Sequence, residues 1–177
     1  KYILTTNYQS PYGALIVGSF RDQLVLCDWK FRKMRDAVDD RIKEGLQADI
    51  MEAESEISRK AVDQLQAYFN GELEQFTIPL LTVGSAFQRK VWDLLRTIPY
   101  GETRSYHELS KMAGNQDAIR AVAAANGANA ISIIIPCHRI IGSDGSLTGY
   151  AGGISVKKRL LKMESRGRSG EQLELFE

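Results

Sequence analysis

Apolar residues along the first eighty positions follow first a strand-like and then a helix-like spacing. Residues 14–20 and 24–29 form two short apolar runs separated by three polar residues, which predicts a β-hairpin. Between residues 55 and 70 the apolar positions recur at helical spacing, and Gly71 supplies a stop signal. The stretch 32–56 is highly charged and lacks an apolar period. We therefore expect it to be loop or a loosely held helix.

The residues after position 84 contain signals for three short helices. Ser85 and Ser105 are each followed three positions later by Gln or Glu, which is the spacing of a capping box at a helix start. Gly114 ends the second helix, and a third helix is expected from Asp117 to about Asn126. Two short helices around a glycine turn are typical of a helix-turn-helix. Many helical proteins contain such a pair without binding DNA.

Small residues dominate the third predicted helix. Arg120 is its one long cationic side chain, and most of its neighbours are alanines. A helix of small residues can lie close to the floor of a narrow groove while one side chain projects. This composition favours the minor groove of DNA over the major groove.

These elements predict two domains and a tail. A last helix is expected over residues 155–164, with its leucines inward and its lysines, including Lys157, largely outward. The pattern changes near residues 82–85, where we place a domain boundary. We expect a small α/β domain over residues 1–83, a mainly α-helical domain with a winged-helix-like helix-turn-helix over residues 84–166, and a flexible tail over residues 167–177.

Charge is distributed unevenly along a chain that is nearly neutral overall. The formal charge of the 177 residues is +1, which at first argues against a nucleic-acid-binding protein. Residues 1–83, however, hold ten basic and thirteen acidic side chains (−3), residues 84–168 hold thirteen and six (+7), and the last nine residues hold three acidic ones (−3). The basic middle block indicates either a surface for a polyanion or ordinary solvated charge.

The composition excludes several classes of protein. The apolar fraction of 44% suits a globular core, and no apolar run approaches the roughly 18 residues of a membrane helix. The chain has only two cysteines and two histidines, too few for a disulfide scaffold, and a four-ligand zinc site would need all four. We therefore expect a soluble cytoplasmic protein with no membrane partner and no metal.

One short stretch combines a thiol with an imidazole. An apolar run over residues 133–135, which we expect to be a buried strand, leads into Pro136 and then into Cys137 beside His138. A thiol attacks well only as a thiolate, and a neighbouring imidazole or cation lowers the pKa of a thiol from about 8.5 into the physiological range. Cys27 lies inside an apolar strand and fits the usual buried, unreactive cysteine. Cys137 is therefore the candidate nucleophile.

The run Pro136-Cys137-His138-Arg139 resembles the active-site motif of the O6-alkylguanine-DNA alkyltransferases. The similarity extends from about Phe87 through Glu164. Further motifs stand at the family's spacing from the cysteine: Ile98-Pro99-Tyr100-Gly101, Ser105-Tyr106, Arg120-Ala121-Val122, Asn129 and Gly149-Tyr150-Ala151-Gly152-Gly153. Residues 1–83 resemble only the family's variable N-terminal domain, and weakly. The resemblance implies a monomer that needs no cofactor and binds the minor groove of double-stranded DNA containing alkylated bases.

The resemblance also implies the chemistry. An alkylated guanine, and by extension an O4-alkylated thymine, would be flipped out of the duplex and its alkyl group moved irreversibly to Cys137. His138 would act as a base through a water molecule, and Glu164 would orient His138. Asn129 would brace the active-site turn by hydrogen bonds. Tyr106 would turn the nucleotide's phosphate outward and protonate the departing guanine.

A set of DNA contacts follows from the same resemblance. Arg120 would fill the gap that the flipped base leaves in the stack, and Lys157 would help to position the region of Tyr106. The other expected DNA contacts are Arg104, Ser105, Ala121 and Gly127. The guanine pocket would be formed by Tyr150 as a wall and by backbone groups of Cys137, Ile140 and Ala151. Two positions depart from the family pattern: Ala151, where some members have Ser, and Ala130, where Pro is frequent.

Two other functions are weighed against alkyl transfer. A papain-type thiol hydrolase is disfavoured because His138 directly follows the cysteine and the distal His with an Asn partner is missing. The stronger rival is a non-enzymatic DNA binder that flags alkylated bases. Retention of Cys137 argues against it, because relatives that only flag lesions have no reactive cysteine.

The end of the chain contains a possible docking motif. Gln172, Leu173, Leu175 and Phe176 resemble the pentapeptide that binds the bacterial sliding clamp. Exposed apolar residues in an acidic tail usually mark a docking site. The alternative is a tail that folds back on its own domain. We expect the sliding clamp to be a partner.

Overall fold

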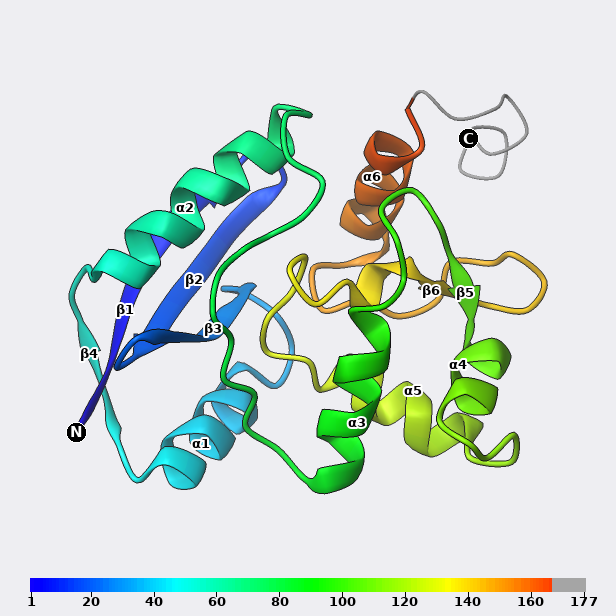
Figure 1. Cartoon of the computed structure of the whole chain (residues 1–177), viewed down its shortest axis with the longest axis horizontal. Helices are drawn as coiled ribbons and strands as arrows, with labels where there is room; N and C mark the ends of the chain where they lie inside the picture. Colours follow the sequence, from blue (N-terminus) through cyan, green and yellow to red (C-terminus); the bar gives the residue numbers. More distant parts are fainter. Residues whose placement is uncertain (167–177) are drawn as a thin grey trace. The chain divides into compact units, whose positions relative to one another are not determined.

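In the computed structural model of the chain, residues 1–166 are described and divide into two compact units (Figure 1). The first unit contains residues 1–85 together with residues 130–134, and the second contains residues 86–129 and 135–166 of the part that the structure describes. The sequence pattern did not indicate that residues 130–134 belong to the first unit. These residues were instead expected to lie in the helical domain, and residues 133–135 were expected to form a buried strand.

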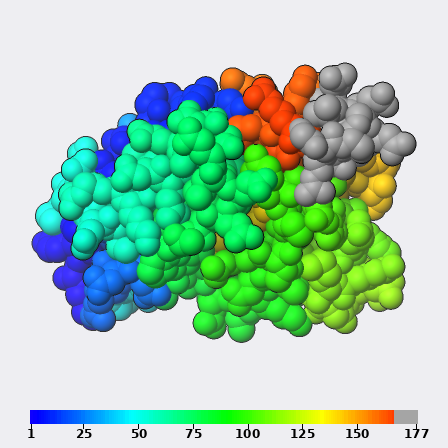
Figure 2. Space-filling view, turned by 45° about the horizontal axis from the view of Figure 1, so that its top comes forward, coloured from blue at the N-terminus to red at the C-terminus, as the bar shows by residue number. Residues whose placement is uncertain are grey.

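A four-stranded sheet forms the framework of the first unit. Its strand order is β3-β2-β1-β4, in which β1, β2 and β3 form an antiparallel meander and β4 lies parallel to β1. The strands are β1 (Tyr2–Ser10), β2 (Gly13–Phe20), β3 (Gln23–Trp29) and β4 (Asp49–Glu52), and the helices are α1 (Arg35–Leu46) and α2 (Glu56–Phe69). A parallel pair requires a crossover connection, which contains α1. The outer face of α2 lies on the surface of this unit (Figure 2).

The predicted hairpin is confirmed as β2 and β3, whose pairing runs from Leu15 with Trp29 to Phe20 with Gln23. The sequence pattern did not predict β1, because the polar residues Thr5 and Ser10 occupy buried positions on it and mask the alternation. It also missed β4, whose four residues are all exposed. Only two residues of α1 are buried, so its apolar face was too narrow to stand out in a charged stretch.

The predicted helix over residues 55–70 is confirmed as α2. The Ser58 amide donates to Ser55 Oγ at 3.0 Å, and the Ser55 amide donates to Ser58 Oγ at 2.8 Å. This reciprocal capping box satisfies two amides that a helix start otherwise leaves unpaired. Gly71 follows the helix with φ of +77°, a left-handed conformation that glycine adopts at no steric cost.

The second unit is built mainly from helices. Three of them, α3, α4 and α5, pack against one another. Two short strands, β5 and β6, pair in parallel and join the residues before α4 to those after Cys137. The elements are α3 (Ala86–Leu95), β5 (Arg104–Ser105), α4 (Tyr106–Met112), α5 (Ile119–Gly127), a 3-10 helix (Cys137–Arg139), β6 (Ile140–Ile141) and α6 (Ile154–Glu164).

Local signals located these helices well, with one correction at α5. The Ser105–Glu108 capping box is present at the start of α4. The third helix begins at Ile119 rather than at Asp117, and no side chain among residues 1–166 caps its start. Asn115 Oδ1 instead accepts a hydrogen bond from the Asp117 amide at 3.0 Å, which stabilises the turn before the helix.

Within residues 1–166, no helix has the length and apolar character needed to cross a lipid bilayer.

Candidate active site

A tight turn at Pro136 presents Cys137 at the start of the 3-10 helix. Pro136 has φ of −81° and ψ of 63°, and the Cys137 amide donates to the Ile135 carbonyl at 2.8 Å. These are the features of an inverse γ-turn, which suits proline because its ring holds φ near this value. The prediction of a strand over residues 133–135 is therefore wrong. Apolar content alone does not distinguish a buried turn from a buried strand.

Two buried asparagines hold this turn. Asn129 Nδ2 donates to the Ile135 carbonyl at 2.9 Å, which is a contact of the kind that a bracing residue makes. Asn126, within α5, donates to the Cys137 carbonyl at 3.4 Å. No role was predicted for Asn126, although a polar side chain on the inner side of an alanine-rich helix was a usable signal. The end of α5 and the backbone of the candidate nucleophile are thus linked by hydrogen bonds.

His138, Arg139 and Glu164 form a buried cluster. His138 Nε2 lies 2.8 Å from Glu164 Oε2. Arg139 binds both oxygens of the same carboxylate, through Nε at 2.8 Å and Nη2 at 3.1 Å, and its Nη1 donates to the Ile98 carbonyl at 2.7 Å. Such two-pronged pairing is among the stronger charge-assisted contacts in proteins. The sequence indicated Arg139 only as part of a motif. In the structure, Arg139 pairs with the buried Glu164 carboxylate and balances its charge.

The protonation states in this cluster follow from its geometry. Burial alone would raise the pKa of the Glu164 carboxyl, but His138 and Arg139 outweigh burial and hold that pKa well below its usual range. Burial lowers the pKa of His138, and the nearby Glu164 only partly opposes this. At neutral pH we therefore assign a neutral imidazole whose Nε2–H donates to an ionised carboxylate.

That assignment leaves the basic lone pair of His138 on Nδ1. This atom is buried and makes no hydrogen bond to any described residue. A buried polar atom without a partner requires an explanation. Here the lone pair is available to accept a proton, which is the requirement for a general base.

Lys157 is fully buried, contrary to the outward orientation expected for the lysines of α6. Its Nζ donates to the carbonyls of Thr148 at 3.1 Å and Gly149 at 3.3 Å, and it lies 5.9 Å from the Tyr106 ring centroid. Burial lowers the pKa of Lys157 to about 8, whereas negative charge at Cys137 acts in the opposite direction. An ammonium at Lys157 and a thiolate at Cys137 therefore stabilise each other.

Tyr106 shares a partner with Lys157. Its hydroxyl donates to the Thr148 carbonyl at 3.1 Å. Burial raises the pKa of Tyr106 above its ordinary value, so the phenol stays protonated at neutral pH and keeps a proton to donate. The structure thus brings Tyr106 and Lys157 to the same stretch of backbone.

The predicted pocket residues lie close to these groups along the chain. Tyr150 meets His138 edge to face, with 6.3 Å between the ring centroids. Ile140 is fully buried in β6, and Ala151 is half-buried. The Tyr150 ring therefore borders the cluster around the candidate base.

One face of α5 presents small residues around Arg120. Arg120, Ala121 and Gly127 are exposed, whereas Val122 lies on the buried side. This exposed face has the composition that the sequence indicated for a close approach to DNA.

Two further residues predicted to contact DNA already have partners in the protein. Arg104 is half-buried and pairs with Glu102 at 3.2 Å. The hydroxyl of Ser105 accepts from the Glu108 amide at 3.0 Å and caps α4. Contacts from these two residues to DNA would require Arg104 to leave its partner, or would use backbone atoms of Ser105.

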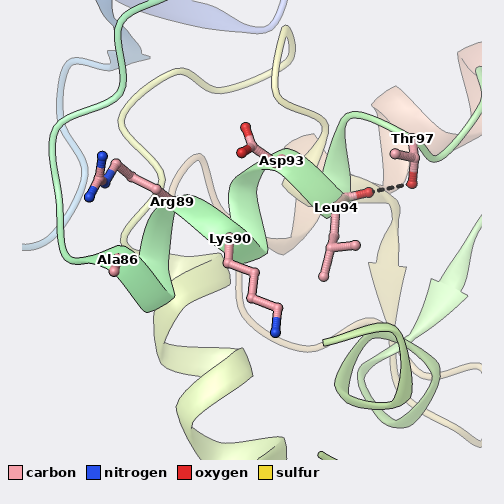
Figure 3. Close-up of a pocket in the computed structure, with 6 residues that line it drawn as sticks. All are labelled: Ala86, Arg89, Lys90, Asp93, Leu94 and Thr97. Atoms are coloured by element: carbon pink, nitrogen blue, oxygen red, sulfur yellow. Dashed lines mark hydrogen bonds between the residues drawn. The ribbon is translucent and has the colours of Figure 1, made fainter. Parts of the chain in front are cut away.

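A shallow hollow of about 500 Å³ lies along α3 (Figure 3). Lys90 is engaged there, because its Nζ donates to the Ala113 carbonyl at 2.8 Å. None of the predicted site residues lines the hollow, which is formed by Ala86, Arg89, Lys90, Asp93, Leu94 and Thr97. Within residues 1–166, no cluster of three or more His, Cys, Asp or Glu side chains could hold a metal ion.

Two protein families match the sequence, each over nearly half of the chain. Residues 3–82 match the family described as 6-O-methylguanine DNA methyltransferase, ribonuclease-like domain. Residues 86–166 match the family described as 6-O-methylguanine DNA methyltransferase, DNA binding domain. The match of the first unit is informative because its sequence motifs alone indicated the relationship only weakly.

Similar proteins agree with the family matches. A methylated-DNA–protein-cysteine methyltransferase of Methanosarcina acetivorans is 43% identical over 157 residues, which cover 89% of this chain and 95% of that protein. The solved O6-methylguanine methyltransferase of Mycobacterium tuberculosis superposes with a TM-score of 0.78, at 39% identity over 99% of each chain. The structure of Mycobacterium tuberculosis OGT in complex with DNA superposes with a TM-score of 0.77, at 40% identity over the full length of both chains.

Replacement of Glu164 by Gln should destabilise the fold and change its pH dependence. Arg139 would then lack a charged partner in a buried site, so we expect the free energy of unfolding at neutral pH to fall by about 3–5 kcal/mol. In the wild type, the depressed pKa of Glu164 contributes stability above the ordinary value of 4.5, and this contribution is lost as the pH falls below it. The variant should lack that loss.

Urea denaturation between pH 7 and pH 3 measures both effects. Glu102→Gln is the matched control, because Glu102 pairs with Arg104 at a half-exposed position and should matter by less than about 1 kcal/mol. Identical pH profiles for the wild type and Glu164→Gln would contradict the assignment.

Proposed function

The chain belongs to the methylated-DNA–protein-cysteine methyltransferase family, and from this premise we propose that it repairs alkylated DNA by moving an alkyl group from guanine to its own Cys137. The observation that supports this assignment best is the pair formed by Cys137 and His138. Cys137 opens a 3-10 helix, and the next residue has one ring nitrogen held by Glu164 and the other available as a base. A nucleophile, a base and an orienting carboxylate are the parts that covalent catalysis needs.

The reaction is a single displacement at the alkyl carbon. The Cys137 thiol gives its proton through a water molecule to His138 Nδ1, and the resulting thiolate attacks the alkyl carbon. A sulfur–carbon bond forms as the bond between that carbon and O6 of guanine breaks, and the guanine leaves with the electron pair. Because the thioether is stable, each protein molecule reacts once. The displacement needs no cofactor, since the protein itself is the acceptor.

Two further residues assist the reaction. Tyr106 supplies a proton to the leaving base, for which a phenol that stays protonated is suited. Lys157 stabilises the thiolate before attack and holds the backbone at Thr148, to which Tyr106 also binds. We propose that Lys157 acts through these contacts and does not touch DNA directly, because it is fully buried.

The α4 and α5 pair acts as a helix-turn-helix that enters the minor groove. Arg120 occupies the space vacated by the flipped base, and Ala121 and Gly127 allow α5 to approach closely. The +7 charge of residues 84–168 favours this side of the chain for DNA. Tyr150, Ile140 and Ala151 enclose the flipped guanine. The protein works as a monomer in the cytoplasm, at the nucleoid.

Alkyl transfer should modify one of the two cysteines only. After incubation with a duplex that contains O6-methylguanine, we expect mass spectrometry to find one added methyl group on the Cys137 peptide and none on the Cys27 peptide. Cys27 is fully buried, and burial raises the pKa of its thiol far above the ordinary value. Cys137→Ala should keep its DNA affinity and lose transfer, whereas Cys27→Ala should keep both.

The same measurement distinguishes the rival function. A protein that binds the lesion tightly but gains no methyl group would be a lesion-flagging binder. Transfer by Cys137→Ala at the wild-type rate would refute the assignment of the nucleophile.

Arg120→Ala should slow transfer from duplex DNA selectively. Filling the gap in a duplex offsets an unstacking cost of about a few kcal/mol, so we expect the rate from duplex DNA to fall about tenfold to a hundredfold. A single-stranded oligonucleotide has no stack to restore, and its rate should change little. Arg89→Ala, an exposed arginine on α3, is the control. An equal loss on single-stranded and duplex substrates would contradict a stack-filling role.

The sliding-clamp motif at Gln172, Leu173, Leu175 and Phe176 lies outside the described residues. We propose that it docks on the bacterial clamp, as its likeness to the clamp-binding pentapeptide suggests. Phe176→Ala should abolish retention on immobilised clamp in a pull-down experiment, because aromatic anchors contribute most to such short motifs. Glu177→Ala, next to the motif, should leave retention unchanged. Equal retention of the wild type and Phe176→Ala would contradict the proposal.

A further inference from the structure

The first unit holds a fully buried carboxylate that the alkyl-transfer chemistry does not use. Asp28 Oδ2 accepts from Arg32 Nη1 at 3.0 Å and from Arg35 Nη1 at 3.1 Å. Asp28 Oδ1 accepts from the Trp29 amide at 3.0 Å and from Ser132 Oγ at 3.0 Å. Burial of a charge is costly unless it is paired and hydrogen-bonded. The four contacts meet that requirement, and one of them comes from a distant part of the sequence.

That distant partner lies in the short segment 130–134, which belongs to the first unit although its sequence neighbours belong to the second. Cys27 of β3 binds the segment twice: its amide donates to the Ala130 carbonyl at 2.9 Å, and its carbonyl accepts from the Ser132 amide at 2.7 Å. The Ser132 hydroxyl adds the bond to Asp28, and both side chains are 0% exposed. Two backbone bonds and one bond to a charged acceptor thus dock the segment on β3.

The chain after Ser132 is strained and leads directly to the nucleophile. Ile133 has φ of 72°, a left-handed conformation that is a genuine outlier for a β-branched residue. The Ile134 amide donates to the Ser132 carbonyl at 2.8 Å, so residues 132–134 form a γ-turn of the rare, positive-φ kind. Such strain persists only where surrounding contacts hold it. The turn at Pro136 follows at once, and Cys137 comes next.

We propose that Asp28, acting through Ser132, is a positioning residue for the Cys137 nucleophile. The inference rests on the alkyl-transfer function proposed above. Arg32 and Arg35 hold one oxygen of Asp28, and the other oxygen holds Ser132 at the start of the strained turn. The conformation of that turn determines the direction of the chain that follows it and therefore the position of Cys137. Displacement at carbon is sensitive to placement, since a shift of 1 Å in a reacting group can cost about a hundredfold in rate.

Single-turnover methyl transfer separates positioning from folding, because each molecule reacts once. The amplitude reports the fraction of competent protein, and the rate constant at saturating O6-methylguanine duplex reports the chemical step. For Ser132→Ala we expect a rate constant about tenfold lower. The amplitude and the half-saturating DNA concentration should remain as in the wild type, because the second unit's DNA-facing residues are untouched.

Ser58→Ala is the matched control for this variant. Ser58 is equally buried in the same unit, and its hydroxyl makes two hydrogen bonds to the backbone of Ser55. Removing this hydroxyl should lower the melting temperature and leave the rate constant unchanged. If Ser132 contributed to stability alone, Ser132→Ala would behave like Ser58→Ala: its melting temperature would fall and its rate constant would not change.

Two variants of Asp28, which accepts the hydrogen bond from Ser132, provide a second test that does not depend on whether Ser132→Ala folds. Asp28→Asn retains an oxygen that can accept from Ser132, whereas Asp28→Ala retains none. We expect Asp28→Asn to react at nearly the wild-type rate constant per competent molecule, and Asp28→Ala to react about tenfold more slowly.

Three results decide the matter. A Ser132→Ala protein with the wild-type rate constant would overturn the proposal, and so would equal rate constants for the two Asp28 variants. A wild-type protein that transfers no methyl group would instead refute the alkyl-transfer function itself, before any variant is compared.

Discussion

One buried carboxylate, Glu164, is the group on which the candidate site depends. A carboxylate inside a protein is tolerated only when its charge and its lone pairs are matched. Arg139 matches the charge with a two-pronged contact, and His138 supplies a further donor. In return the carboxylate selects the tautomer of His138 and leaves the basic lone pair on the opposite ring nitrogen. The candidate base is therefore defined by the same contacts that make burial of the charge possible.

The same contacts connect elements that are far apart in the sequence. Arg139 reaches the Ile98 carbonyl, just beyond α3, while Glu164 is the last residue of α6. Arg139 thus fastens the 3-10 helix that begins with Cys137 to the chain beyond α3 by a hydrogen bond and to α6 by an ion pair. Asparagines from α5 and its end fasten the turn before it. The in-line attack proposed for Cys137 requires this degree of restraint.

Sequence motifs name the candidate reactive residues directly, whereas they say little about the contacts that position those residues. Cys137 and His138 are neighbours in the chain, so a short motif is enough to identify them as candidates. The capping residues of α2 and α4 likewise predict where these helices begin. The pairing of Asp28 with Ser132 spans 104 positions, and nothing local to either residue indicates it. Lys157 was assigned to the wrong side of α6 because lysine is normally exposed. The carbonyls of Thr148 and Gly149, which accept hydrogen bonds from its ammonium group, help to explain its burial.

Burial of cations also changes how the charge of the second unit should be understood. The +7 of residues 84–168 includes Arg139 and Lys157, both buried and both engaged with groups inside the protein. Arg104, which is half-buried, has a carboxylate partner as well. Counterion release depends on the phosphates that a protein contacts and not on its formal charge. The charge available to DNA is therefore smaller than the sequence total.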